Sequence, residues 1–191
     1  MRIRYSFSSR KNRHIENIGK QRWKYPSLIK KIMNDSDIIL EVLDARFPDE
    51  SRNPEIENQI KQQNKQLIYV FNKSDLLAKK SKKINLAPSI LVSCKERGDI
   101  KKLRDLIKIL SKDVLKNFEE KRKVIVGIIG YPNTGKSSLI NSLIGKSSAG
   151  VGSEAGFTKG IQKLRLSEDI LLLDSPGVIP EEQYSHTEKE K

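Results

Sequence analysis

The residues of this chain best suited to bind phosphate form one glycine-rich run, Gly130 to Ser137, which reads Gly-Tyr-Pro-Asn-Thr-Gly-Lys-Ser. Glycines let the backbone approach phosphate oxygens closely, the lysine can reach the β- and γ-phosphates of a nucleotide, and the serine hydroxyl can bind Mg²⁺. An apolar run, Val124 to Ile129, precedes the motif and a helical pattern follows it. Backbone N–H groups of residues 133–138 would gather at the positive end of that helix. The run therefore predicts a phosphate-binding loop.

A second motif, Asn72-Lys73-Ser74-Asp75, ends another apolar run and has the chemistry to select guanine. The Asp75 carboxylate can accept from the N1–H and the N2 amine of guanine, a pair that adenine lacks. Unmet hydrogen bonds of this kind discriminate by about 10⁴–10⁵-fold. We expect Lys73 to lay its stem over the base and Asn72 to tie neighbouring loops together. Ser93-Cys94-Lys95 ends a further apolar run, where the backbone at Cys94 would face guanine O6.

A third motif, Asp174-Ser-Pro-Gly177, follows the apolar run Ile170 to Leu173. In company with the other two, it predicts that Asp174 holds Mg²⁺ through a water and that the Gly177 N–H senses the γ-phosphate. Thr158 is the preferred candidate for a second hydroxyl on Mg²⁺, and Ser153 competes with it. Loops held by a γ-phosphate and released on hydrolysis form a switch.

The pattern of apolar residues predicts how these motifs are positioned. Strands alternating with helices indicate an α/β fold, a mostly parallel six-stranded sheet with helices on both faces. In such sheets ligands bind at the carboxyl ends of the strands, where all these motifs lie. We expect Gly98-Asp99 to supply the turn and cap of the third helix. The predicted helices are 23–34, 54–63, 99–118 and 137–143, and the predicted strands are 37–44, 66–71, 89–92, 124–129, 161–166 and 170–173.

The charge of the chain is strongly positive and unevenly distributed. The net charge is +13, with +9 in residues 1–31, +9 in residues 76–123, −4 in residues 32–75 and −1 in residues 124–191. Two basic blocks beside a near-neutral remainder are typical of a protein that binds a polyanion such as RNA, and a generally basic surface is the alternative. Neither block has the apolar face that membrane binding requires, and no apolar run is long enough to span a bilayer. A single cysteine, Cys94, fits a reducing compartment, and we expect a cytoplasmic protein.

The order of the motifs is unusual, because the guanine element precedes the phosphate loop by more than fifty residues. In this order, and with Asp44-Ala45-Arg46-Phe47-Pro48 ending the first strand, residues 24–180 resemble the circularly permuted GTPases of the YlqF/YawG type (TRAFAC class), a ribosome-assembly family. The resemblance implies a Ras-like P-loop fold with a guanine-specificity half, 37–118, and a phosphate and switch half, 124–180. It also implies hydrolysis of GTP to GDP and a role in assembly of the large ribosomal subunit.

The resemblance bears on catalysis as well. Val178 occupies the place where most GTPases have the glutamine that orients the attacking water, so intrinsic hydrolysis should be slow and a partner or ion should assist. Asn133 resembles a loop asparagine that helps relatives to hold K⁺, and Asp44 and Arg46 are expected to have a structural role. His14 shows no motif match and is expected to face solvent or RNA.

The ends of the chain are expected to be mobile. Residues 1–22 are basic and poor in apolar side chains, and residues 181–191 form a charged tail. The Gly/Ser-rich segment 145–160 is expected to move as well. Family members carry a further RNA-binding domain after the G domain, and this chain, which ends fourteen residues after Gly177, is expected to lack it.

The leading hypothesis is a monomeric, Mg²⁺-dependent GTPase, stimulated by K⁺, that binds ribosomal RNA or the pre-ribosomal large subunit. The alternatives are a nucleotide-sensing RNA-binding module with negligible turnover, and a GTPase acting on tRNA or a protein partner. The predicted catalytic residues are Lys136, Thr158 and Gly177, and the predicted metal ligands are Ser137, Thr158 and Asp174 for Mg²⁺ and Asn133 for K⁺. The predicted nucleotide-binding residues are Asn72, Lys73, Asp75, Ser93, Cys94, Lys95, Pro132, Asn133, Thr134, Gly135, Lys136, Ser137, Ser138, Asp174 and Gly177.

Overall fold

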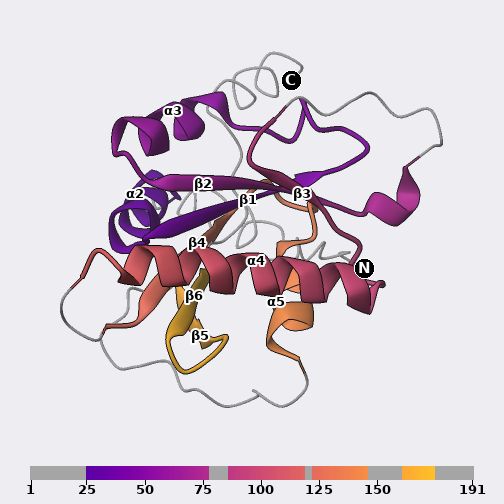
Figure 1. Cartoon of the computed structure of the whole chain (residues 1–191). Coiled ribbons are helices and arrows are strands. Elements are labelled where there is room, and N and C mark those ends of the chain that lie inside the picture. Colours follow the sequence, from indigo (N-terminus) through magenta and orange to yellow (C-terminus); the bar gives the residue numbers. More distant parts are fainter. Residues whose placement is uncertain (1–24, 78–85, 119–121, 146–160, 175–191) are drawn as a thin grey trace, which may run out of the picture.

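A six-stranded sheet forms the centre of the molecule in the computed structural model, which describes residues 25–77, 86–118, 122–145 and 161–174 (Figure 1). The strand order is β3-β2-β1-β4-β6-β5, and only β5 runs antiparallel to its neighbour. This confirms the predicted α/β fold. The strands are β1 Ile38–Asp44, β2 Gln66–Asn72, β3 Ser89–Leu91, β4 Val124–Ile129, β5 Gln162–Arg165 and β6 Ile170–Asp174.

Helices cover both faces of the sheet, as the alternating pattern predicts (Figure 1). α2 (Tyr25–Asp35) and α3 (Pro54–Gln62) pack on one face, and α4 (Arg97–Leu115) and α5 (Lys136–Ile144) pack on the other. A short 3₁₀ turn, η1 (Ser74–Leu76), follows β2. In the part of the chain that the structure describes, no helix combines the length and the apolarity that crossing a bilayer requires.

The central strand β1 shows why the sheet is buried on both sides. All seven of its residues are buried. Leu40 and Val42 belong to the core beneath α4 and α5, whereas Ile39 and Leu43 belong to the core beneath α2 and α3. Side chains of a strand alternate between faces, so an unbroken apolar run supplies both cores at once.

Two contacts hold α2 against the sheet. Gly127 of β4 leaves room for the helix, because a Cβ there would lie 2.4 Å from Ser36 Oγ. The Lys65 ammonium donates to the carbonyls of Asn34 (2.7 Å) and Ser36 (2.8 Å), and also to that of Met33. These carbonyls lie at the end of α2, where a helix has no internal donors left and a cation is favourable.

A clamp around Asp37 joins the two halves of the chain. Its carboxylate accepts two hydrogen bonds from Arg122, at 3.2 and 2.7 Å, and one from the backbone N–H of Ile125 at 2.8 Å. The Arg122 guanidinium also lies 3.7 Å from the centroid of the Phe118 ring. The start of β1 is therefore fixed to the start of β4 and to the end of the segment that follows α4.

A buried acidic cluster lies between β1, β2 and α3. Glu57 accepts from Arg52 at 2.8 and 2.7 Å and from the Tyr69 hydroxyl at 2.7 Å. Glu41 is 1% exposed, and its Oε1 accepts from the backbone N–H of Asn53 at 3.0 Å. Burial, together with the charge of Glu57, raises the pKa of Glu41 from 4.5 to about 8. Glu41 is therefore held in the neutral form at neutral pH.

The predicted bounds of one helix are wrong. α4 begins at Arg97, two residues earlier than expected, and ends at Leu115, three residues earlier than expected, and its N-cap residue is Glu96. The Asp99 carboxylate does not cap the helix but accepts from the backbone N–H of Ser93 at 3.1 Å. Because the start of α4 lies beside the loop that contains Ser93, the Asp99 carboxylate binds that backbone N–H instead of an N–H in the first turn of its own helix.

Candidate nucleotide-binding site

The predicted motifs meet at the carboxyl ends of the strands, because the strands that end in them are parallel. Asn72 ends β2, Gly130 follows β4 and Asp174 ends β6. Asp44 ends β1, which lies between β2 and β4. The guanine element and the phosphate loop are thus only one strand apart in space, although more than fifty residues separate them in the chain.

The phosphate loop has an unusual backbone that its residue types allow. Gly130 has φ +146° and Gly135 has φ +94°, in the region where L side chains are strained, and Asn133 has φ +65°. The Thr134 hydroxyl donates to the carbonyl of Tyr131 at 2.9 Å, across the loop. α5 begins directly afterwards at Lys136, so the N–H groups of its first turn face the loop. Pro132, Asn133, Ser137 and Ser138 are exposed.

Lys136 is buried at the base of this loop. Its ammonium donates to the carbonyls of Gly130 at 3.0 Å and Tyr131 at 3.1 Å, and the residue is 7% exposed. Burial lowers the pKa of Lys136, and the charge of Asp174 opposes that shift. An ammonium in this position can leave the loop carbonyls for a phosphate, whose full negative charge is the stronger partner.

Asn72 fastens the guanine element to the phosphate loop. Its Nδ2 donates to the carbonyl of Thr134 at 2.9 Å, and its Oδ1 accepts from Cys94 Sγ at 3.3 Å. A Cβ on Gly135 would lie 2.3 Å from Asn72 Nδ2, so a glycine is required there for the amide to pass. The predicted tying role of Asn72 thus has a geometric basis: three loops meet at a single side chain.

The Asp75 carboxylate is held between the two loops that the sequence assigned to guanine. It accepts from Lys95 Nζ at 2.7 Å and from the Ser93 hydroxyl at 2.8 Å. The hydrogen bond from Lys95, followed by that from Ser93, lowers the pKa of Asp75, which is therefore ionised at neutral pH. An ionised, oriented carboxylate is what recognition of the N1–H and N2 amine of guanine requires.

Lys73 links the guanine element to two further segments. It adopts a left-handed backbone, φ +63°, and its ammonium donates to Asp44 Oδ2 at 2.8 Å and to the carbonyl of Asn133. Asp44 also accepts from Arg46 Nε at 2.9 Å and Nη2 at 2.7 Å. Hydrogen bonds from Arg46, and from Lys73, hold the pKa of Asp44 well below its usual range. Sequence reasoning identified Asp44 only as part of a motif and missed its contact with Lys73, for which the sequence carries no local signal.

Asp174 fits the requirement for a magnesium site. Its Oδ1 is buried and has no hydrogen-bond partner among the described residues, and burial raises the pKa of this carboxylate. No group of three or more His, Cys, Asp or Glu side chains in the described ranges has metal-binding geometry. Mg²⁺ in phosphate-loop proteins commonly uses one carboxylate with a hydroxyl, waters and phosphate oxygens, so Asp174 and Ser137 suit it.

Several predicted residues lie outside the described part of the chain. They are His14, Ser153, Thr158, Gly177 and Val178. The predicted mobile segments 1–22 and 181–191 also lie there, as does all but Gly145 of the Gly/Ser-rich segment 145–160. The roles of the site residues toward a nucleotide stay predictions.

Comparison with known proteins finds relatives that are described as GTP-binding proteins. Residues 125–191 match the family model described as 50S ribosome-binding GTPase. An uncharacterized GTP-binding protein of Methanocaldococcus jannaschii is 47% identical over 156 residues, covering 80% of this chain and 40% of that protein. The nuclear GTP-binding protein NUG1 of Saccharomyces cerevisiae is 34% identical, covering 84% of this chain and 35% of that protein.

A solved structure shares both the fold and part of the sequence. GNP-bound YlqF from T. maritima has a TM-score of 0.52 and 26% identity, covering 83% of this chain and 59% of that chain. The chain spans about two fifths or less of the length of the M. jannaschii and S. cerevisiae relatives named above. From the permuted order of its motifs, its sheet and these relatives, the chain belongs to the circularly permuted GTPases of the ribosome-assembly family that includes YlqF.

Proposed function

We propose that this protein binds GTP, hydrolyses it slowly with Mg²⁺, and acts as a nucleotide switch during assembly of the large ribosomal subunit. The observation that carries the proposal is the junction at Asn72, which holds the guanine element on the phosphate loop in a single site. Its relatives are GTP-binding proteins, and the matched family model is that of a ribosome-binding GTPase.

The chain's own residues divide the work of binding. Asp75 would accept from guanine while Ser93 and Lys95 keep its carboxylate oriented. Lys136 would exchange the carbonyls of Gly130 and Tyr131 for phosphate oxygens. Exchange of two neutral acceptors for charged ones favours the triphosphate, because charge-assisted hydrogen bonds are stronger.

Asp174 and Ser137 would hold Mg²⁺, with Thr158 supplying a second hydroxyl. When bound, the ion neutralises charge on the β- and γ-phosphate oxygens. Gly177 would sense the γ-phosphate through its N–H. Val178 has no side-chain hydrogen bond to orient water, so we propose that a partner, and K⁺ near Asn133, raise a low intrinsic rate.

Steady-state GTP turnover in potassium buffer, with and without purified large ribosomal subunits, tests the proposal. We expect the subunits to raise turnover by about tenfold or more, which corresponds to about 1.4 kcal/mol. A Lys136→Ala variant should show no turnover in either condition. GTP turnover that large subunits leave unchanged would contradict the ribosomal role, and absence of GTP binding would contradict the site itself. Equal rates of GTP turnover in sodium and potassium chloride would contradict the proposed stimulation by K⁺.

A further inference from the structure

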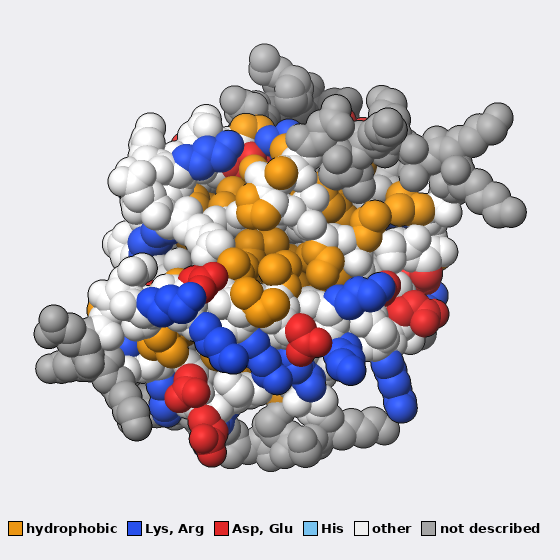
Figure 2. Space-filling view, viewed as in Figure 1, with side chains coloured by type: hydrophobic (Ala, Val, Ile, Leu, Met, Phe, Trp, Pro, Cys, Tyr) orange, Lys and Arg blue, Asp and Glu red, His pale blue; other side chains and the backbone are white. Residues whose placement is uncertain are grey.

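Helix α4 buries one face in the core and exposes the opposite face to solvent. Its Ile100, Leu103 and Ile107 are buried against the sheet. Most of its charged side chains lie on the other side and form a row of lysine and arginine side chains along the helix, interrupted by a few carboxylates (Figure 2). This face takes no part in the nucleotide site described above.

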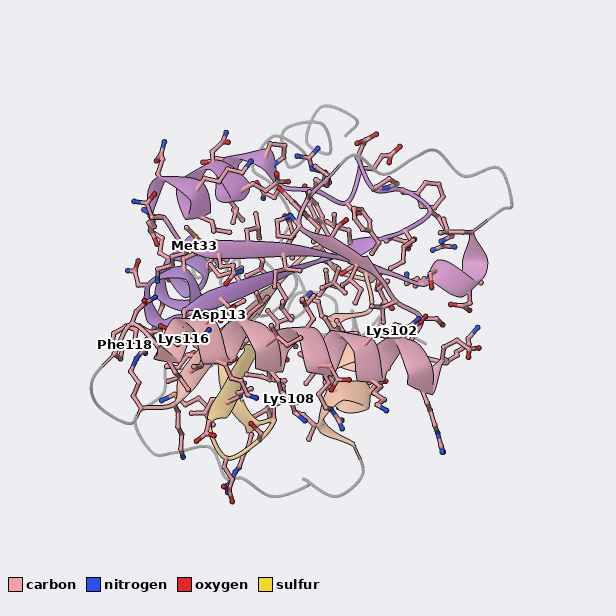
Figure 3. The ribbon with its side chains drawn as sticks, in the orientation of Figure 1. Met33, Lys102, Lys108, Asp113, Lys116 and Phe118 are labelled. Carbon is pink, nitrogen blue, oxygen red and sulfur yellow. The ribbon has the colours of Figure 1, made fainter. Side chains whose placement is uncertain are left out.

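The exposed basic residues follow helical spacing and therefore line up. Arg97, Lys101, Lys108, Lys112 and Lys116 are separated by four, seven, four and four residues. At 100° per residue, these intervals keep all five side chains on one side of the helix. Lys102, Lys108 and Lys116 mark the length of α4 in Figure 3. The row spans about 28 Å at 1.5 Å per residue, with one carboxylate, Asp105, inside it. We call this set the α4 basic stripe, and its members are Arg97, Lys101, Lys108, Lys112 and Lys116.

Most of these charges are available to a partner. Arg97, Lys101, Lys108 and Lys112 form no ion pair with any other residue in the described ranges. Lys116 pairs with Asp113 at 2.8 Å, but the side chains are 74% and 57% exposed, and exposed pairs of this kind are weak. A polyanion could replace that carboxylate at little cost.

We propose that the α4 basic stripe binds the phosphate backbone of structured RNA. This deepens the proposed function and rests on it for the class of the partner. A duplex presents phosphates at regular intervals along its length, and a row of cationic side chains matches that pattern without reading sequence. A protein partner is disfavoured because lysine is depleted in protein interfaces. A membrane is disfavoured because the apolar side of α4 is already buried in the core.

The stripe begins beside the guanine loop and extends away from it. Asp99 in the first turn of α4 accepts from the backbone N–H of Ser93, whose hydroxyl donates to Asp75. Lys108 and Lys112 lie nine and thirteen residues beyond Asp99, about 13–20 Å along the axis. Substitutions at these two lysines therefore leave the contacts of the nucleotide site intact, and RNA and nucleotide can be bound together.

A matched pair of double variants of the full chain tests the proposal. Lys108→Gln with Lys112→Gln removes two charges from the stripe, and Lys30→Gln with Lys61→Gln removes two from exposed positions of α2 and α3 on the opposite face. Glutamine preserves helix propensity. The probe is a fluorescent RNA duplex of about 20 base pairs, long enough to cover the stripe. Binding is measured by anisotropy across a salt series.

We expect the α4 variant to lose about tenfold or more in RNA affinity and to reduce the salt slope by about 1–2, since each phosphate contact contributes about 0.9. The α2/α3 variant should stay within about twofold of the wild type. Equal losses in both variants, or no RNA binding by the wild type, would overturn the proposal. So would loss of binding to polyglutamate or anionic vesicles in the α4 variant while RNA binding is retained.

GTP affinity and turnover of the same proteins separate this proposal from the proposed function. Unchanged GTP affinity with reduced RNA affinity supports the stripe. A wild type that binds RNA through α4 but neither binds nor turns over GTP would refute the proposed function and leave the stripe standing.

Discussion

The ammonium of Lys73 lies 2.8 Å from Asp44 Oδ2, so a residue of the guanine element is held by the end of the neighbouring strand β1. The same ammonium donates to the carbonyl of Asn133 in the phosphate loop. Because Lys73 is expected to cover the base, Asp44 acts on the guanine pocket through Lys73. We therefore propose that Asp44 positions a binding residue.

Asp44→Ala should weaken GTP binding by about tenfold, because Lys73 loses its charged partner. Arg46→Ala is the control, since it removes the other partner of Asp44 and leaves the Lys73 contact in place. Fluorescent nucleotide titration measures both. An Arg46 variant as weak as the Asp44 variant would show that the whole motif, and not the Lys73 contact, is needed.

Asp75→Asn should change nucleotide choice from guanosine toward xanthosine, because an amide suits the altered base edge. We expect GTP affinity to fall by about a hundredfold or more, because the amide cannot accept from both the N1–H and the N2 amine of guanine and leaves one of these donors unmet. Lys95→Gln should cost little, because the Lys95 side chain is 75% exposed and such ion pairs are weak. Competition titrations with GTP and XTP give the answer, and undiminished GTP affinity in the Asp75 variant would mean that the base binds elsewhere.

Gly135→Ala should abolish tight GTP binding. The φ of +94° at Gly135 strains any side chain, and the added Cβ would lie 2.3 Å from Asn72 Nδ2, so the junction of the two motifs must open. Gly98→Ala is the matched control, since nothing lies within 4 Å of a Cβ at that position. Nucleotide affinity and thermal stability of both variants are measured together. A Gly135→Ala variant that is stable and binds GTP normally would show that the junction is dispensable.

Glu41 predicts a pH dependence of stability. Its pKa is raised from 4.5 to about 8 in the folded state, so its contribution is fully present below pH 4.5 and is lost as the pH rises toward 8. The loss is on the order of 5 kcal/mol. Glu41→Gln should remove this pH dependence. The free energy of unfolding of the variant, measured with urea, should therefore rise relative to that of the wild type as the pH rises. Glu55→Gln, on the exposed side of α3, should leave the difference flat. A constant difference for Glu41→Gln would contradict the assignment.

Arg122→Gln should lower the free energy of unfolding by about 1–3 kcal/mol, because it breaks a two-point hydrogen bond to the partly buried Asp37. Lys116→Gln, at an exposed ion pair, should change it by no more than about 0.5 kcal/mol. The two variants are compared by their urea unfolding midpoints, and we expect the slope of the free energy of unfolding against urea concentration to be unchanged in both. Equal effects would show that the clamp adds nothing beyond a surface pair.

The sequence predicted the strands and the site loops well for a physical reason. β1 and β4 are short runs of almost unbroken apolar residues, which are typical of a buried parallel strand, and the motifs follow them directly. Side-chain contacts between segments distant in the chain were not predictable in the same way. Asp44 is the clearest case, because its partner Lys73 lies 29 residues later and becomes a neighbour only when β1 and β2 pair. Glu41 is another, since a single acid within an apolar run gives no sign of the neighbours that bury it.

The strand order has a consequence for how the protein is made. β3, β2 and β1 form one contiguous block from the earlier part of the chain, and β4, β6 and β5 form the other, with β1 against β4 as the seam. During synthesis the first block emerges with the free edge of β1 exposed, an edge that invites pairing with other chains. That edge is covered only when Val124–Ile129 has left the ribosome. Because the phosphate loop follows these residues directly, a nascent chain gains protection of this strand edge and the phosphate loop itself at almost the same moment.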